Sequence, residues 1–525
     1  MAVPQTDSIP VPARLSGAQR WTLVVSCVSV ALVIASMAAL YGALPQIAES
    51  TGATQAQLTW VVDAYTLALA CLVLSGGAVG DRYGRRIVLV AGLVIFAAGS
   101  AIPLFADRPA WVIAARAVAG VGAALVMPST LSILTAGFPA DKQGRAVGVW
   151  AGVAGSGGVI GLLGSGLLLQ VFSWRAVFVA LTAAATILVV AALTLTESRD
   201  RDRPPVDVAG AMSSAAAVGV FVVAVTAAPE HGWTSPLVLT TLAVALAATV
   251  VFVLTESRVP HPLLPIRLLV RRGFAAGAVS LALQFLVTFG LFYLIVQYFQ
   301  LILDYSPLQS ALALAPMAGP LVGISLIAPW LCERAGLKIM TATGMSVIAA
   351  GLVWLSRIDT HTTYLYLLGP VLIMSAGLGL CAAPATAAIV ADTPRAKHGI
   401  AAAVNDAARE IGAAIGIAVA GSVLAAGYHH RIQPALTHLP PPARGPVSDS
   451  LAAALAVADK AGPAAQPLAD FARDAFLTGT HHATLTLAGI AATGAALALT
   501  APASRPGRSA AAAAAAAAAH RYLGR

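Results

Sequence analysis

The sequence predicts an all-α polytopic membrane protein with two six-helix bundles and two further helices inserted between them. Of the 525 residues, 58% are hydrophobic and 10% are charged, whereas soluble domains contain about 25% charged residues. The mean hydropathy is +0.84 over the whole chain, and two short motifs recur at about half its length. These properties exclude a soluble globular domain, a disordered chain and a coiled coil.

Fourteen apolar runs are candidates for membrane-spanning helices. At about 1.5 Å per residue, a run of about 20 residues crosses a hydrocarbon layer of about 30 Å. The first run is longer than a signal-peptide core of about 7–15 residues, so we keep it as a helix. The predicted spans are 21–45, 58–80, 87–106, 111–134, 146–169, 176–196, 208–228, 236–255, 274–300, 308–331, 338–357, 364–391, 400–426 and 481–502.

The loop charges predict the orientation of these spans. One set of alternate loops carries sixteen Lys and Arg residues, and the opposite short loops carry three. Lys and Arg gather in cytoplasmic loops, so we expect a multi-pass plasma-membrane protein with both termini in the cytoplasm. The sixteen are Arg82, Arg85, Arg86, Lys142, Arg145, Arg199, Arg201, Arg203, Arg258, Arg267, Arg271, Arg272, Arg334, Lys338, Arg395 and Lys397; the three are Arg108, Arg175 and Arg357.

The two halves of the chain contain an internal repeat. The hexapeptide 139–144 (PADKQG) returns 255 residues later at 394–399 (PRAKHG), and 81–86 (DRYGRR) echoes 333–338 (ERAGLK) at an offset of 252. Parallel halves are the plan of transporters that move one half against the other around a central site. The predicted parts are a cytoplasmic tail 1–20, an N-terminal bundle 21–196, a linker with two inserted helices 197–272, a C-terminal bundle 273–502 with an external loop 427–480, and a low-complexity cytoplasmic tail 503–525.

The loop after the second span reads GAVGDRYGRR at 77–86. Here the chain resembles the major facilitator superfamily, whose signature in this loop is G-x-L-A-D-R-x-G-R-[RK]. The resemblance implies the major facilitator fold and a cytoplasmic gate, whereas the alternative interpretation is a basic loop that only sets the topology. The gate residues would be Gly77, Asp81, Arg82, Gly84, Arg85 and Arg86.

Further segments resemble the fourteen-helix drug:proton antiporter branch of that superfamily, which exports drugs and antibiotics. They are 60–67 (WVVDAYTL), 116–130 and 404–412 (VNDAAREIG). The sequence departs from the branch in the first span, where Ser36 and Tyr41 replace an acid and an amide. In the fifth span Leu162 replaces the proline of the antiporter motif, and Gly161, Gly164 and Gly166 remain.

Charged residues inside spans cost at least about 2.5–3.5 kcal/mol each and are functional candidates. Asp406, Arg409 and Glu410 share one helix face because they are three and four residues apart. Two neighbouring carboxylates in a low-dielectric cavity do not both ionise easily, which suits one of them to carry a proton. The alternative is a static Arg409 salt bridge between helices.

A second charged pair lies in the N-terminal half, where we expect Asp63 and Arg116 to pair. We assign proton coupling to Glu410 first, then Asp406, then Asp63, with Arg116 and Arg409 as their cationic neighbours. Aromatic residues of the ninth span are candidates for lining a hydrophobic substrate pocket: Phe285, Phe289, Phe292, Tyr293 and Tyr298.

The resulting hypothesis is a proton-coupled exporter of a hydrophobic small molecule, active in drug or antibiotic resistance by alternating access. The alternative is a proton-linked importer or facilitator of a small polar nutrient, because one fold hosts both. No motif indicates an enzyme, and the four cysteines lack C-x-x-C spacing, so we expect neither a metal nor a cofactor besides the proton gradient. We expect a monomer in the lipid bilayer that binds no nucleic acid, and the Ala, Gly and Arg bias is typical of high-GC bacteria.

Overall fold

The computed structural model describes residues 15–53, 55–105, 108–199, 207–260, 262–394 and 397–500, all helical apart from short connections. The predicted tail 503–525, Arg201, Arg203 and Arg395 lie outside the described residues. The long helices are α1 (Gly17–Ala39), α3 (Gln55–Tyr83), α4 (Arg85–Ala101), α5 (Pro109–Gly137), α6 (Ala140–Leu169), α7 (Arg175–Leu193), α8 (Val208–His231), α9 (Pro236–Arg258), α11 (Arg272–Leu301), α13 (Ala318–Leu355), α14 (Tyr364–Ala391), α15 (His398–Leu436) and α18 (Gln466–Thr500). The short ones are α2 (Leu44–Thr51), α10 (Ile266–Leu269), α12 (Pro307–Leu314), α16 (Pro441–Asp449), α17 (Leu451–Ala461) and the 3-10 turns η1 (Ile102–Leu104), η2 (Ala315–Met317) and η4 (Pro463–Ala465).

Gly84 and Gly336 divide helices at equivalent places in the two halves. Gly84 has φ 118° where α3 gives way to α4, and Gly336 has φ 82° within α13. L side chains rarely adopt such values, so glycine is required at both breaks. These are the glycines of the 81–86 and 333–338 repeat, so the sequence repeat is also a structural one.

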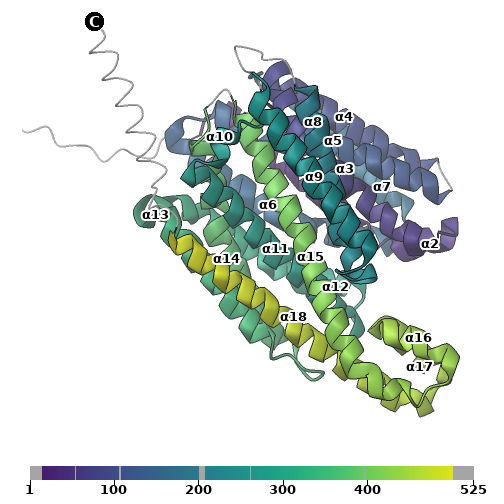
Figure 1. Ribbon diagram of the computed structural model, residues 1–525. Helices are drawn as coiled ribbons and strands as arrows, with labels where there is room; N and C mark the ends of the chain where they lie inside the picture. Colours follow the sequence, from purple (N-terminus) through teal and green to yellow (C-terminus); the bar gives the residue numbers. More distant parts are fainter. Residues whose placement is uncertain are drawn as a thin grey trace, which may run out of the picture.

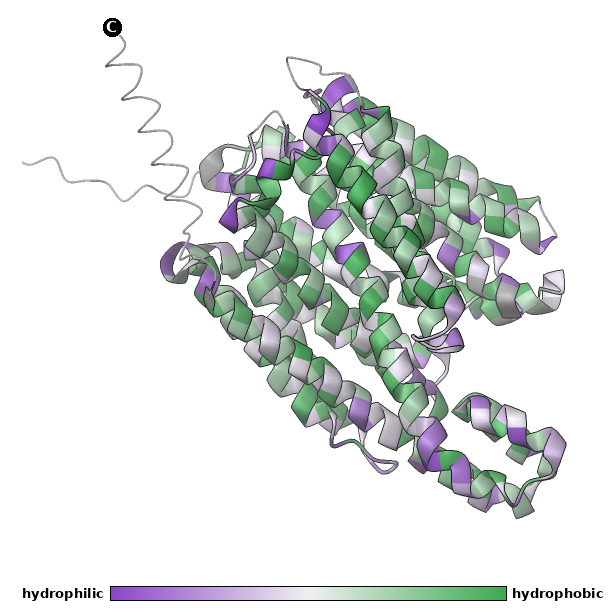
Figure 2. Cartoon of the chain, viewed as in Figure 1, coloured by the Kyte–Doolittle hydropathy of each residue, from purple (hydrophilic) through white to green (hydrophobic). Residues whose placement is uncertain are grey.

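Thirteen described helical segments are long and apolar enough to cross a membrane. One of them, Pro307–Leu355, is 49 residues long and contains the break at Gly336. Counting its two parts separately gives fourteen spans in the described residues, the number that the sequence predicts. Figure 2 shows hydrophobic residues along the length of the helices and hydrophilic ones mostly near their ends and in the connections.

The helices form two bundles, each with its own hydrophobic core. One core is built mainly from α1 and α3–α7, and a second mainly from α11–α15 and α18. The inserted helices α8 and α9 pack against each other, and α8 also packs against α3 and α15 (Figure 1). The bundles meet where α6 packs on α13 and where α15 packs on α3 and α5.

Helix α15 runs from one end of the molecule to the other. Its first turn lies beside Asp81 and Arg85, at an end that we call the basic face. Its last turns lead into α16 and α17, which project from the opposite end, here called the hairpin face (Figure 1).

Two predicted boundaries are corrected by the structure. The first span ends at Ala39 rather than at residue 45, because a turn at 40–43 leads into α2, which has a proline in its first turn. Residues 427–480, predicted as a loop, are largely helical: α15 continues to Leu436, and α18 already begins at Gln466. Apolar side chains explain the difference, since Ile432, Val447, Leu451 and Phe476 are buried in one core.

Candidate functional site

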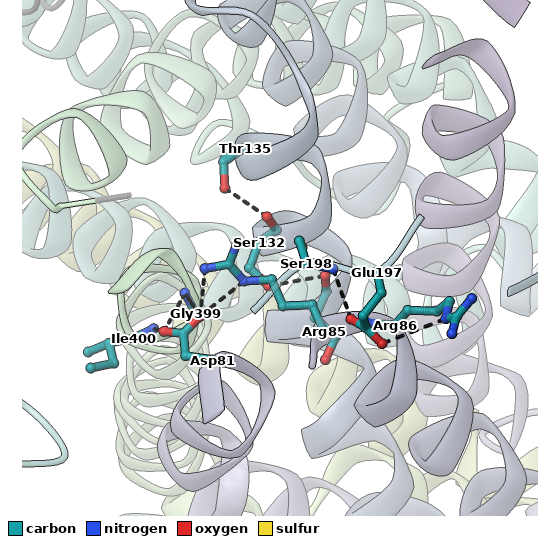
Figure 3. Close-up of polar contacts among 10 residues, drawn as sticks. Asp81, Arg85, Arg86, Ser132, Thr135, Glu197, Ser198, Gly399 and Ile400 are labelled. Carbon is teal, nitrogen blue, oxygen red and sulfur yellow. Dashed lines mark hydrogen bonds and ion pairs between the residues drawn. The ribbon is translucent and has the colours of Figure 1, made fainter. Parts of the chain in front are cut away.

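Asp81 joins the two bundles at the basic face. Its carboxylate accepts hydrogen bonds from the backbone N–H groups of Gly399 (3.0 Å) and Ile400 (3.3 Å), at the start of α15 in the other bundle. It also accepts from Arg85 Nη2 (2.7 Å) and Nε (3.0 Å) (Figure 3). An anion at a helix N-terminus is stabilised by the unpaired N–H groups and the helix dipole. The contact holds α3 against α15, and the side chains of Asp81 and Arg85 are both buried.

Gly77 and Gly84 let the backbones approach closely around Asp81. A Cβ atom at Gly77 would collide with the carbonyl oxygen of Gly399 and lie 2.7 Å from Ala403 Cβ. A Cβ atom at Gly84 would lie 2.7 Å from the carboxyl carbon of Glu197. These glycines are therefore required by the contacts of Asp81 and Glu197.

Glu197 is a residue of this region that the sequence analysis missed. Its carboxylate accepts from the N–H groups of Arg86 (3.1 Å) and Ile87 (3.2 Å), in the first turn of α4. It also lies 3.6 Å from the Arg86 guanidinium. The Arg82 guanidinium carbon lies 5.3 Å from the Tyr83 ring centre. The sequence signal for Glu197 is an acid one residue past the end of the predicted span 176–196, at the start of a basic loop.

The three glycines of the fifth-span motif have different surroundings. A Cβ atom at Gly161 would collide with the Ala35 carbonyl oxygen of α1. A Cβ atom at Gly166 would lie 2.8 Å from Leu308 of α12, in the other bundle, and one at Gly164 would meet nothing within 4 Å. Gly161 and Gly166 thus permit helix contacts, as small residues do in membranes.

Arg116 binds Ser36 and α3 rather than Asp63. Its guanidinium donates to Ser36 Oγ (2.9 Å) and to the carbonyl oxygens of Val61 (3.1 Å) and Ser36 (3.3 Å). It also lies 4.1 Å from the Tyr65 ring centre. The predicted pairing with Asp63 is wrong for the described residues, because the guanidinium bonds to Ser36 and to the Val61 carbonyl oxygen instead. Ser36, which stands where the branch has an acid, is the residue that receives Arg116.

Asp63 is half-buried and electrostatically close to Tyr41. Arg116 interacts with the same tyrosine. Tyr41 stands where the branch has an amide. The two residues by which the first span departs from the branch, Ser36 and Tyr41, therefore both lie beside Arg116. The described structure brings Asp63 and Arg116 near one side chain without an ion pair between them.

The three charged residues of α15 lie together at the centre of the molecule. Arg409 Nη1 is 3.8 Å from Asp406 Oδ1, and Asp406 is fully buried. Glu410 interacts electrostatically with both. It also interacts with Tyr65 of the other bundle. The three residues therefore share one face of α15, as their spacing predicts. This face is turned toward the contact between the bundles.

Several neighbours of this cluster were not identified as such from the sequence. Asn405 Nδ2 donates to Asp406 Oδ1 (3.1 Å) and its Oδ1 accepts from Thr386 Oγ1 of α14 (2.8 Å). Trp150 of α6 and Phe285 of α11 face the Arg409 guanidinium. Phe285 in turn stacks on Phe289, at 5.8 Å and 24°. Two carboxylates and one arginine at this depth have the chemistry to bind and release a proton.

Comparison with known proteins identifies relatives over most of the chain. The family model described as Major Facilitator Superfamily matches residues 26–417. The chain is 32% identical to the puromycin resistance protein of Streptomyces alboniger, over 77% of this chain and 81% of that one. It is also 32% identical to the multidrug efflux pump LfrA of Mycolicibacterium smegmatis (91% and 94% covered). The methyl viologen resistance protein SmvA of Salmonella typhimurium is 30% identical (90% and 96% covered).

Solved structures share the fold at low sequence identity. The human organic anion transporter MFSD10 superposes with a TM-score of 0.61 at 14% identity, covering 92% of this chain and all of that one. The proton:xylose symporter XylE superposes with a TM-score of 0.58, also at 14% identity, covering 91% of this chain and 95% of that one. Both likenesses support the predicted two-bundle fold.

Proposed function

Because this chain belongs to the Major Facilitator Superfamily, we propose that it is a proton-coupled exporter of hydrophobic small molecules. Its relatives at about 30% identity are named for resistance to puromycin and to methyl viologen and for multidrug efflux. The single observation that carries the proposal is the buried Asp406, Arg409 and Glu410 cluster, which contacts both bundles. Protonatable groups at a contact between bundles are suited to couple proton binding to their relative movement.

The proposed location is the plasma membrane, with the basic face in the cytoplasm. The sixteen-to-three distribution of basic residues over alternate loops supports this orientation. Export then moves the substrate from the basic face to the hairpin face, and protons move in the opposite direction. We propose that one chain suffices, since each chain contains both bundles.

Asp81 and its neighbours are proposed as the gate of the basic face. The carboxylate bridges the end of α3 and the start of α15, so this face opens only when the Gly399 and Ile400 contacts break. Arg85 is the ion-pair partner, and Arg86 with Glu197 anchors α4. On this proposal, the contacts of Asp81 belong to the state that is closed at the basic face.

Proton coupling is assigned to Glu410 first, Asp406 second and Asp63 third. Glu410 is half-buried and lies near Tyr65 of the other bundle. Asp406 is fully buried, and its Oδ2 has no hydrogen-bond partner among the described residues. A carboxyl without a hydrogen-bonded cation is a better proton acceptor than one held by arginine. Arg409 and Arg116 are proposed to set the charge balance of the two bundles.

The test is transport by purified protein in liposomes with an imposed pH gradient. Radiolabelled puromycin and methyl viologen are the probes, since they appear in the names of relatives. We expect gradient-driven accumulation that a protonophore abolishes, and at least a tenfold loss in Glu410→Gln or Asp406→Asn. Unchanged accumulation in both variants and in Asp63→Asn would refute the coupling assignment. A susceptibility screen without any resistance phenotype would favour the nutrient importer instead.

A further inference from the structure

Arg409 lies between two aromatic rings that belong to different bundles. Its guanidinium carbon is 5.3 Å from the ring centre of Trp150 on α6 and 4.4 Å from that of Phe285 on α11. Arg409 is 5% exposed and Trp150 is fully buried. The negative face of an aromatic ring attracts a cation, most strongly where water is excluded. The two rings therefore hold the arginine from opposite bundles.

The same arginine is not hydrogen-bonded to the carboxylate beside it. The 3.8 Å separation between Arg409 Nη1 and Asp406 Oδ1 exceeds a hydrogen bond. Within the described residues, Arg409 Nη1 and Asp406 Oδ2 are both buried without a hydrogen-bond partner. Buried donors and acceptors are normally paired, because an unpaired one loses its hydration without compensation. The missing hydrogen bond between Arg409 and Asp406 requires a structural cause. We attribute it to the Trp150 and Phe285 rings, which hold the guanidinium.

The Trp150 ring is itself fixed in place. Its indole N–H donates to Thr130 Oγ1 of α5 at 3.1 Å, and that hydroxyl donates to the Met127 carbonyl oxygen at 2.7 Å. Trp150 thus moves with the first bundle. Arg409 and Phe285 belong to the second bundle, so only the Trp150 contact changes when the bundles move apart.

We infer that Trp150 is a positioning residue that holds Arg409 away from Asp406 while the basic face is closed, and releases it when that face opens. The inference rests on the proposed proton-coupled function. Trp150 and Arg409 are ten and eleven residues from the first residues of α6 and α15. Both therefore lie roughly 15 Å from the basic face, in the part that separates on opening.

The contact makes proton binding at Asp406 depend on the state of the protein. In the closed state the carboxylate lacks a hydrogen-bonded cation, so it binds a proton once water reaches it from the hairpin face. When α15 leaves α6, Arg409 loses the Trp150 ring and bonds to Asp406, which returns its proton to water at the basic face. Arg409 stays cationic throughout, so each cycle carries one proton inward through this carboxyl.

Among the residues that the structure describes, few other charged groups act on Asp406 and Arg409. Asp406 and Arg409 both interact with Glu410 of the same helix, which interacts with Tyr65 of α3. Arg116 of α5 lies over the ring of the same Tyr65. The contacts from α6, α11 and α14 are uncharged. Trp150 of α6 and Phe285 of α11 face Arg409, and Thr386 of α14 bonds to Asn405, which bonds to Asp406.

The test compares Trp150→Leu and Trp150→Phe with Trp174→Leu, which removes a buried indole that packs on Phe178 of the first bundle. Two rates are measured in liposomes with puromycin or methyl viologen, whichever the wild type transports: accumulation driven by a pH gradient, and exchange without one. A pH-sensitive dye reports protons moved per probe molecule. We expect Trp150→Leu to lower accumulation and proton flux at least tenfold while exchange stays within twofold. Trp150→Phe keeps a ring and should retain at least a third of the accumulation.

Three results would count against the inference. Equal losses of exchange and accumulation in Trp150→Leu, as expected for Trp174→Leu, would show that Trp150 only supports packing. Wild-type accumulation in Trp150→Leu would do the same. Should Trp150→Leu fail to fold, Thr130→Val frees the indole, and an unchanged ratio of accumulation to exchange would overturn the inference. A wild type without gradient-driven transport of either probe would instead refute the proposed function, and this inference with it.

Discussion

Single buried polar side chains hold helices together, both between the bundles and within one of them. Asp81 neutralises the positive end of α15 and pairs with Arg85 of its own bundle. Arg116 fixes α5 to α1 and α3 through Ser36 and Val61. Each bond is buried, so its loss leaves a partner that water cannot reach. Substitutions at these residues therefore test gating and stability separately.

Replacing Asp81 by Asn should open the basic face. The variant loses the charge that attracts the α15 N-terminus and Arg85, so the closed state is destabilised. We expect at least tenfold slower export and faster thiol labelling of Ser325→Cys, a fully buried position on α13 that packs against α6. The four native cysteines are replaced beforehand.

Glu197→Gln is the matched control for Asp81→Asn. Glu197 also accepts from the first turn of a helix, but both partners belong to the first bundle. This substitution should lower stability by about 0.5–2 kcal/mol, as for the loss of a helix cap, without changing the labelling rate. Equal labelling in the two variants would contradict the gate assignment.

Replacing Ser36 by Ala should destabilise the first bundle. Arg116 loses the hydroxyl that accepts its hydrogen bond, and a bond to a charged group contributes about 1.5–3 kcal/mol. Ser29→Ala is the control, because Ser29 is buried on the same helix and its hydroxyl has no hydrogen-bond partner among the described residues. Thermal unfolding in detergent should show a lower Tm for Ser36→Ala alone. Equal shifts would refute the importance of the Arg116 bond.

Helix contacts depend on where glycines face a neighbouring backbone. Gly161 of α6 lies against the Ala35 carbonyl of α1, whereas Gly164, one turn further, has open space around its Cα. On α15, Gly412 and Gly416 lie in the same way against the carbonyls of Ala282 and Leu286 of α11. Close backbone approach strengthens the van der Waals packing of helices in lipid, where the hydrophobic effect does not drive their association.

Alanine at Gly161 and at Gly164 should have opposite effects. Gly161→Ala adds a methyl group where the Ala35 carbonyl oxygen lies, so α6 must move away from α1. Gly164→Ala adds one in open space and should be neutral or stabilising by up to about 1 kcal/mol, since alanine favours a helix. The comparison is made by Tm and by the yield of monodisperse protein. A loss in Gly164→Ala as large as in Gly161→Ala would contradict the packing account.

The whole molecule must change shape at the contacts between bundles in order to transport. At the basic face, α3 meets α15 at Asp81, and α6 meets α13 where a Cβ atom at Gly144 would lie 3.4 Å from Pro329 Cβ. Helix α6 also reaches α12 near the hairpin face, at Gly166 and Leu308. Alternating access requires the contacts at the basic face to break in each cycle.

A disulfide between Gly144→Cys and Pro329→Cys should lock the basic face closed. The Cβ separation is close to the range of about 3.5–4.5 Å that disulfides require. We expect oxidation to stop transport and a reductant to restore it, measured in liposomes on a background without native cysteines. Gly158→Cys with Ala38→Cys is the control, since these positions are 4.0 Å apart within one bundle. Transport through the cross-linked Gly144–Pro329 pair would refute movement at this contact.

The sequence by itself determined the fold class and the grouping of the three charged residues of α15 on one helix face. Apolar runs predict the spans because lipid demands about 20 apolar residues for each crossing. The repeated Gly84 and Gly336 segments predict two related halves, and the spacing of Asp406, Arg409 and Glu410 predicts a shared helix face. All of these depend on distances along one chain segment, which helix geometry converts directly into distances in space.

Tertiary structure decided which residues from different helices meet. Arg116 binds Ser36 instead of Asp63, and Trp150 faces Arg409 across the bundles. The segment 427–480 is largely helical because its apolar residues share one core. No spacing along the chain encodes such pairings, since they depend on how far each helix is rotated and shifted against its neighbours. The physical reason is that packing between helices, and not the local period, selects partners that are distant in sequence.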